Sequence, residues 1–102
     1  MQTFKRITPA LIRAAAEYTT IPVSTLLSKV RTRQICQVRF AIMWVARDTL
    51  GLSLCRIRDE LKMGNHTTIH SGLLRAKELL ETSEHFRGLV AHLVLASKGE
   101  AA

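Results

Sequence analysis

The segment 64–69 reads Gly-Asn-His-Thr-Thr-Ile and holds the side chains with the clearest binding chemistry in the chain. A helical pattern over residues 53–61 precedes it, and the four residues 62–65 between the two helical patterns have the length of a helix-turn-helix turn, with a glycine where such a corner often needs one. Asn65 can cap the second helix. Three polar side chains then project from the first turn of that helix: His66, Thr67 and Thr68. Because the first turn of a recognition helix meets base edges and phosphates, the pattern indicates DNA binding.

Basic residues are concentrated in one part of the chain, whose net charge is +7. Between Ser28 and Arg47 there is no acid, and the basic residues are Lys29, Arg31, Arg33, Arg39 and Arg47. Most of the eight acids lie later, among them Asp48, Asp59, Glu60, Glu78, Glu81 and Glu84. This separation predicts one basic face and one mixed face. A basic run is often only a solvated surface, but a nearby recognition helix favours a track for phosphates.

Other kinds of chemistry find little support. His66 and His70 have the i, i+4 spacing of metal ligands, but no third ligand lies near them, so no metal site is expected. Cys36 and Cys55 are not closely spaced and read as reduced, mostly buried thiols of a cytoplasmic protein. The 102 residues contain no G-x-x-x-x-G-K-[ST] loop and no catalytic constellation, so neither a nucleotide cofactor nor enzymatic activity is expected. The low aromatic content of 5% argues against a stacking surface for single strands.

The elements that must position these residues are helices. A chain of 102 residues supports a single domain, over 1–102, and no apolar run has the ~20 residues of a membrane helix or the form of a signal peptide. Caps, prolines and apolar spacing predict an all-α fold of about six helices. We expect them at about 8–19, 22–29, 32–51, 53–61, 65–82 and 83–98.

Helical spacing also predicts the core. Residues 35–46 contain only two strongly polar side chains, so their helix should be central and buried nearly all round. Ser53 and Ser83 should cap the fourth and sixth helices. The other inward residues are expected to be Leu11, Ile12, Ala15, Tyr18, Leu26, Leu27, Leu54, Ile57, Leu61, Ile69, Leu73, Ala76, Leu80, Phe86, Leu89, Val90 and Leu93.

Several motifs occur together in a familiar order. They are Ala16-Glu17-Tyr18, Leu26-Leu27-Ser28-Lys29, Arg31-Thr32-Arg33, Val38-Arg39, Ala46-Arg47, Leu52-Ser53-Leu54 and His66-Thr67-Thr68. From about Ile7 to Phe86, this order resembles the C-terminal DNA-binding domain of the DnaA family of bacterial replication initiators. The resemblance implies a helical fold related to the Trp-repressor type, which binds a short, non-palindromic DNA duplex as a monomer.

The resemblance also implies residue roles. It places Arg39 in the minor groove, beside a basic loop (residues 29–33) that contains Lys29, Arg31 and Arg33. It places His66 and Thr67 on bases in the major groove. The residues that it places on the DNA backbone are Thr68, Arg75 and the helix start Ser53-Leu54. On residue chemistry alone, Arg39 could instead extend from a buried helix to water.

The chain departs from the family pattern at the turn. The family usually has Gly-Gly-Arg-Asp before His-Thr-Thr, whereas residues 62–65 are Lys-Met-Gly-Asn. An aspartate suits the amino group of cytosine, whereas Asn65 suits the N6/N7 edge of adenine, so the preferred site should differ from the family's box. Two family prolines, near the basic loop and in the fourth helix, are here Val38 and Cys55.

The sequence therefore predicts a sequence-specific double-stranded-DNA-binding protein that regulates replication initiation or transcription. It would act in the bacterial cytoplasm, at the nucleoid, and Met1 with its short lead fits a complete small protein. A protein that occupies initiator boxes without ATP also suits a phage or mobile element. The alternative is an interaction adaptor that keeps the fold without the DNA code and pairs through the apolar segment Leu89–Leu95.

Overall fold

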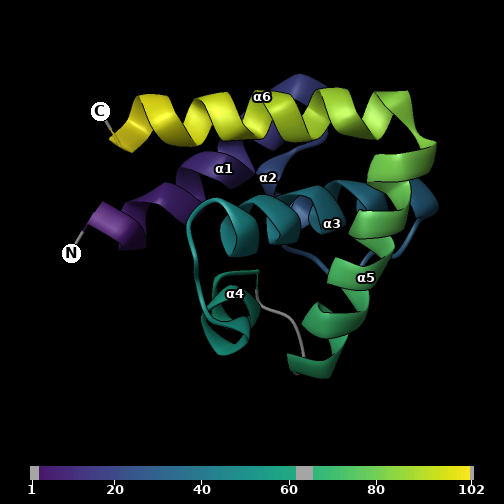
Figure 1. Ribbon diagram of the computed structural model, residues 1–102, viewed down its shortest axis with the longest axis horizontal. Helices are drawn as coiled ribbons and strands as arrows, with labels where there is room; N and C mark the ends of the chain where they lie inside the picture. Colours follow the sequence, from purple (N-terminus) through teal and green to yellow (C-terminus); the bar gives the residue numbers. More distant parts are fainter. Residues whose placement is uncertain (1–2, 62–65, 102) are drawn as a thin grey trace.

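The computed structural model describes residues 3–61 and 66–101, with side chains for 10–61 and 67–97. This part of the chain forms six α-helices and no β-strand (Figure 1). The helices are α1 Thr3–Thr19, α2 Val23–Leu26, α3 Arg33–Asp48, α4 Leu54–Leu61, α5 His66–Thr82 and α6 Glu84–Ala101. The predicted all-α fold of about six helices is confirmed.

Helix α3 lies at the centre of the molecule and packs against all five other helices. In Figure 1, α6 lies along α1 on one side of α3, while α4 lies on the opposite side and α5 runs across the end. A helix surrounded in this way must be apolar on most of its surface. The α3 residues with no exposed surface are Ala41, Ile42, Met43, Val45 and Ala46. The prediction of a central buried helix is confirmed.

Both ends of α3 follow from local sequence signals. Thr32 caps the start, because its Oγ1 accepts a hydrogen bond from the Ile35 N–H at 3.4 Å. The helix ends at Asp48, and the turn that follows includes Gly51 at φ 69°, a left-handed conformation that suits glycine. The Gly51 N–H donates to the Arg47 carbonyl at 3.2 Å and the Leu52 N–H to the Ala46 carbonyl at 3.1 Å, so the chain turns toward α4 with these α3 carbonyls satisfied.

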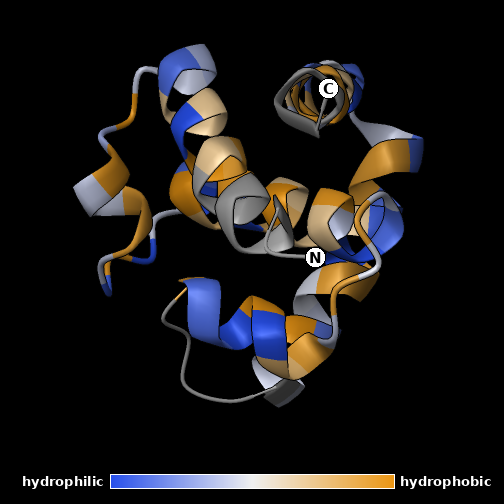
Figure 2. Ribbon diagram, turned by 90° about the vertical axis from the view of Figure 1, so that its left-hand side faces the viewer, coloured by the Kyte–Doolittle hydropathy of each residue, from blue (hydrophilic) through white to orange (hydrophobic). Residues whose placement is uncertain are grey.

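The outer helices surround α3 with their apolar faces. Hydrophobic and hydrophilic residues are interspersed along the helical ribbon in Figure 2, as expected of amphipathic helices. Ser83 caps α6 as predicted, since its Oγ accepts a hydrogen bond from the Phe86 N–H at 3.1 Å. Phe86, Leu89 and Leu93 are buried. Among the described helices, none is long and apolar enough to cross a membrane.

Helices α1 and α6 differ from their predicted bounds. Helix α1 begins at Thr3 rather than Thr8, so Pro9 lies inside it. A proline inside a helix removes one helical hydrogen bond and crowds the carbonyl four residues before it, which is why its local chemistry favoured a helix start at this position. Helix α6 continues to Ala101, past the predicted end at Lys98. Tyr18 is 42% exposed, not inward as predicted, and its ring lies against that of His92 with centroids 4.8 Å apart.

The two cysteines also differ from their expected placement. Both are free thiols, but Cys55 is exposed and Cys36 is half-buried, whereas the sequence predicted mostly buried side chains. Cys55 lies on the outer face of α4, because Ile57 and Leu61 occupy the face that packs inward. Within residues 3–61 and 66–101, no three potential ligands gather in a way that could hold a metal ion.

Candidate nucleic-acid interface

The first turns of α5 present a polar outer face. Ile69 and Ala76 are fully buried against the core. The exposed residues before and between them are Thr67, His70, Ser71, Leu74 and Arg75. Thr68 is half-buried. The predicted division of α5 into an inward stripe and an outward face is confirmed, and the outward face carries hydroxyl and imidazole groups that can hydrogen-bond.

The site residues at the start of α5 are only partly described. Asn65, together with the predicted turn over residues 62–65, lies outside the described residues, and so does the side chain of His66. The backbone of α5 nevertheless begins at His66, where the sequence predicted the second helix of the motif.

Helix α5 lies close to α3 because it carries a glycine at the contact. A methyl group on Gly72 would lie 2.5 Å from the Met43 Sδ and 3.1 Å from the Phe40 Cδ1. Contacts this short are sterically unfavourable, so a larger residue would displace either α5 or Met43. The absence of a side chain at residue 72 therefore determines how closely α5, the candidate recognition helix, packs against α3.

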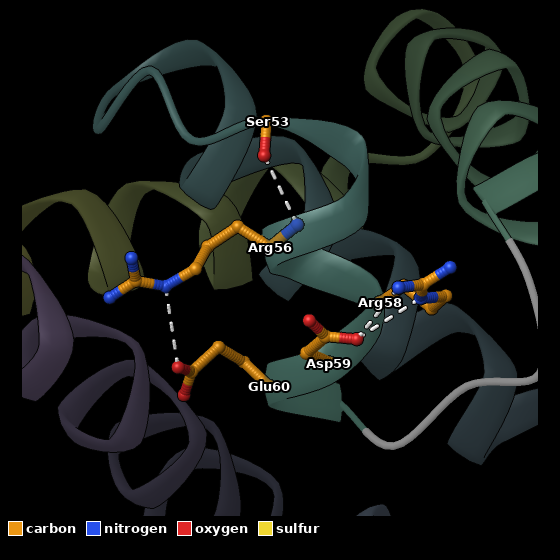
Figure 3. A network of polar contacts seen from close by, with 5 residues as sticks. All are labelled: Ser53, Arg56, Arg58, Asp59 and Glu60. Atoms are coloured by element: carbon orange, nitrogen blue, oxygen red, sulfur yellow. Dashed lines mark hydrogen bonds and ion pairs between the residues drawn. The ribbon is translucent and has the colours of Figure 1, made fainter.

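The start of α4 is capped as predicted. The Ser53 Oγ accepts a hydrogen bond from the Arg56 N–H at 3.1 Å (Figure 3). Ser53 is exposed and Leu54 is half-buried, so this helix start is open to solvent.

The acids of α4 are paired with basic neighbours. Arg56 lies 3.4 Å from Glu60, and Arg58 lies 3.0 Å from Asp59, as Figure 3 shows. Pairs this exposed add little stability. They do place an opposite charge beside each carboxylate, which lowers the repulsion that these acids would exert on a nearby polyanion.

The basic loop between α2 and α3 is exposed. Lys29, Arg31 and Arg33 all have exposed side chains, and among the described residues none of the three forms an ion pair with a carboxylate. Their cationic groups therefore remain free to bind an anionic ligand. Val30, within the same loop, is 43% exposed.

Arg39 does not extend outward as the sequence predicted. Its side chain is 5% exposed, and its guanidinium donates hydrogen bonds to four carbonyl oxygens of residues 25–30, at 2.7–3.3 Å. A guanidinium has five N–H donors in a fixed plane, and here a bend of the chain supplies several acceptors at once. The prediction that this side chain reaches toward a minor groove is therefore corrected, as is the alternative that it extends to water.

The basic loop and α5 lie on neighbouring sides of α3. Arg39 holds the chain that leads into the basic loop, whereas the adjacent Phe40 faces Gly72 of α5. Consecutive residues of a helix point about 100° apart, so these two contacts are made on adjacent faces of α3. The exposed cations and the polar outer face of α5 are thus attached to one rigid element.

Comparison with known proteins identifies the family. A model described as the bacterial dnaA protein helix-turn-helix matches residues 9–75. The chain belongs to the DnaA helix-turn-helix family. It is 31% identical over 84 residues to the chromosomal replication initiator protein DnaA of Thermomicrobium roseum, across 81% of this chain and 18% of that protein. It is 28% identical over 85 residues to the protein of the same name from Aliarcobacter butzleri, across 83% of this chain and 19% of that protein.

The chain spans less than a fifth of the length of these DnaA relatives. No solved structure matches it significantly. The DnaA helix-turn-helix domain is a non-catalytic domain that binds DnaA-box DNA. The matched range contains the basic loop, the start of α4 and the start of α5, and it ends at Arg75, whose exposed side chain pairs with Glu78 at 3.0 Å.

Sequence reasoning missed one residue that supports this DnaA-like surface, Ser28. Ser71 lies one turn beyond Thr67 on the outer face of α5, as the i, i+4 spacing indicates. Ser28 supports the bend before the basic loop, where its Oγ donates to the Thr25 carbonyl at 2.6 Å and accepts from the Val30 N–H at 3.2 Å. A serine before a basic run gives no such signal in the sequence alone.

Proposed function

We propose that this chain binds double-stranded DNA sequence-specifically, as a monomer, at a non-palindromic site related to the DnaA box. The start of α5, with Asn65, His66 and Thr67, would read bases in the major groove. Thr68, Arg75 and the helix start at Ser53-Leu54 would contact phosphates. Lys29, Arg31 and Arg33 of the basic loop would track the backbone at the adjacent minor groove, where a narrow A/T-rich segment attracts guanidinium groups.

One observation carries this proposal: the exposed cations of the basic loop and the polar outer face of α5 are attached to adjacent sides of α3. A groove-reading helix beside a basic arm is a recurrent arrangement in DNA-binding proteins. The net charge of +7 adds long-range attraction to a polyanion.

Selection of bound duplexes from a random pool tests the proposal most directly. We expect enrichment of one non-palindromic motif with an A/T-rich flank. On the selected duplex, a protein that neutralises about six phosphates should lose affinity with a log–log salt slope near −5. A scrambled duplex of equal composition serves as the control. Recovery of no motif, or equal affinity for the two duplexes, would contradict sequence-specific binding.

The alternative role of an interaction adaptor has less support. It relied on the apolar segment Leu89–Leu95 as a surface for a partner, but Leu89, Val90 and Leu93 are buried in the core. Leu95 is 69% exposed, and a single exposed leucine is normal on a protein surface. An adaptor would also bind no duplex tightly, which the same titrations would reveal.

The biological role that we propose is regulation of replication initiation or transcription at the bacterial nucleoid. The 102 residues contain no phosphate-binding glycine loop, so these residues would occupy a box without ATP-dependent assembly. Such occupancy excludes another protein from the same box. The expected result is that increasing amounts of this protein displace a DnaA initiator from a labelled box duplex. Unlabelled box duplex should reverse this displacement by binding the protein, whereas unlabelled scrambled duplex should not.

A further inference from the structure

Arg39 stands apart from the other charged residues by its burial. Among the described side chains it is the one charged residue in the buried class, at 5% exposure. No carboxylate pairs with it in the described part of the chain. A buried guanidinium is costly unless its donors are satisfied, so its partners must be the groups that hold it in place.

Those partners are main-chain carbonyls that lead into the basic loop. Arg39 Nε donates to the Leu26 carbonyl at 2.9 Å, and Nη1 donates to the Val30 carbonyl at 2.7 Å. Nη2 donates to the carbonyls of Ser28 at 2.7 Å and Thr25 at 3.3 Å. One planar group on α3 thus fixes the backbone from the end of α2 into the basic loop.

The same bend is closed a second time by Ser28. Its Oγ joins the Thr25 carbonyl to the Val30 N–H, at 2.6 Å and 3.2 Å, and the Ser28 N–H also donates to the Thr25 carbonyl at 3.1 Å. Thr25 and Val30 are therefore held by both side chains. Arg39 and Ser28 therefore form one hydrogen-bond network, and this network holds residues 25–30 in a single conformation.

We propose that Arg39 is a positioning residue for DNA recognition, which acts through the basic loop and does not itself touch the duplex. It holds the loop before binding, so that Lys29, Arg31 and Arg33 do not have to be ordered when DNA arrives. Preordering of this kind raises affinity because less conformational freedom is lost on association. The DNA part of this inference rests on the proposed function; the ordering of the loop does not.

Arg39→Lys is the variant that separates positioning from contact. Lysine keeps the charge and binds phosphate well, but its single ammonium group cannot donate to four separate carbonyls as the planar guanidinium of arginine does. In the free protein we expect amide hydrogen exchange at Ser28 and Val30 to become about tenfold faster or more, because their hydrogen bonds open more often. Arg87→Lys is the matched control, since Arg87 donates to one carbonyl, that of Leu80, and takes no part in the hydrogen bonds of residues 25–30.

Binding to the selected duplex provides the second readout, measured at a temperature where both variants are fully folded. Arg39→Lys should lower affinity about tenfold and flatten the preference for an A/T-rich flank, with the salt slope unchanged because no phosphate contact is lost. Combined with Arg31→Ala, its effect should be much smaller than in the wild-type background, because both substitutions act through the same loop.

Several outcomes would overturn the proposal. Unchanged amide exchange at Ser28 and Val30 in Arg39→Lys would show that the network does not order the loop. Full additivity with Arg31→Ala, or a salt slope lowered by about one, would show an independent DNA contact. If Arg39→Lys does not fold, Ser28→Ala decides, because it removes part of the same network without leaving a buried charge and should accelerate exchange at Val30. If the wild type binds no duplex, the proposed function fails, while the exchange experiment still decides whether Arg39 orders the loop.

Discussion

The arginines at the basic loop occupy two different environments, one exposed to solvent and one buried. Arg31 and Arg33 are exposed, so their guanidinium donors remain available for phosphate oxygens, with which they form strong charge-assisted hydrogen bonds. Arg39 is buried, and its donors are used by main-chain carbonyls. The exposure of the side chain, rather than the residue type, therefore decides which arginines are expected to contact DNA.

Removal of either exposed loop arginine should weaken binding without changing the sequence preferred in the major groove. For Arg31→Ala and Arg33→Ala we expect the salt slope to fall by about one each, since each loses about one phosphate contact. Affinity titrations on the selected duplex at several salt concentrations measure this. Arg87→Ala, a substitution outside the residues proposed to contact DNA, should leave the slope unchanged. A slope equal to that of the wild type in both loop variants would remove the basic loop from the interface.

Asn65 is expected to set specificity at one base pair. Asn65→Asp should barely change the stability of the fold, because the two residues cap helices equally well. At a base edge they differ, since a carboxylate repels adenine N7 while an amide satisfies N6 and N7 together. We expect preference to shift from adenine toward cytosine by roughly 1–3 kcal/mol. Selected-site profiles of both proteins check this, and identical profiles would limit Asn65 to capping.

At the scale of elements, the position of α5 depends on its contact with α3. The candidate recognition helix has one apolar stripe, and at Gly72 its backbone lies so near Met43 and Phe40 that a methyl group would meet the Met43 sulfur at 2.5 Å. Met43 is fully buried and has little room to move. The interface between the two helices therefore fixes the outer face of α5 relative to the basic loop.

Gly72→Ala should destabilise the fold although alanine favours helices. The gain in helix propensity is about 1 kcal/mol, whereas overpacking in a filled core costs about 1–3 kcal/mol, so we expect a lower midpoint of thermal unfolding and weaker DNA binding. Gly88→Ala is the matched control on α6, because its methyl group would meet only the Tyr18 hydroxyl, at 3.2 Å, on a partly exposed side chain. That variant should be as stable as the wild type or more stable. Equal effects of the two substitutions would contradict the close α3–α5 contact.

The described molecule measures 33 × 28 × 25 Å, which is close to one turn of B-DNA, about 34 Å. A helix in the major groove and a loop at the adjacent minor groove would already occupy most of that turn. We therefore expect one chain per site. A helix-turn-helix dimer would instead need two half-sites one turn apart.

Sedimentation of the protein with a duplex that carries one selected site tests this stoichiometry. The expected complex contains a single chain, at protein concentrations from below to well above the dissociation constant. A duplex with two sites one turn apart serves as the control for a complex of two chains. Two chains on the single-site duplex would show that the functional unit is a dimer.

The sequence by itself determined the helical architecture. Ser53 and Ser83 cap the helices that they were predicted to cap, Thr32 caps the start of α3, and Gly51 lies in the turn after its end at Asp48. Capping and left-handed turns are interactions among residues a few positions apart, so the sequence predicts them. The inward stripe of α5 was also predictable, since helical periodicity alone places Ile69 and Ala76 on one face.

Tertiary structure decided the features that depend on residues distant in the sequence. Pro9 favours a helix start by its local chemistry, yet α1 begins at Thr3 and continues through it. Tyr18 lies near the end of α1, at the edge of the core, where its ring meets His92 of α6. Arg39 turns inward because the bend at residues 25–30 presents carbonyl oxygens within its reach, and the direction of those carbonyls exists only once α2, the basic loop and α3 have packed together.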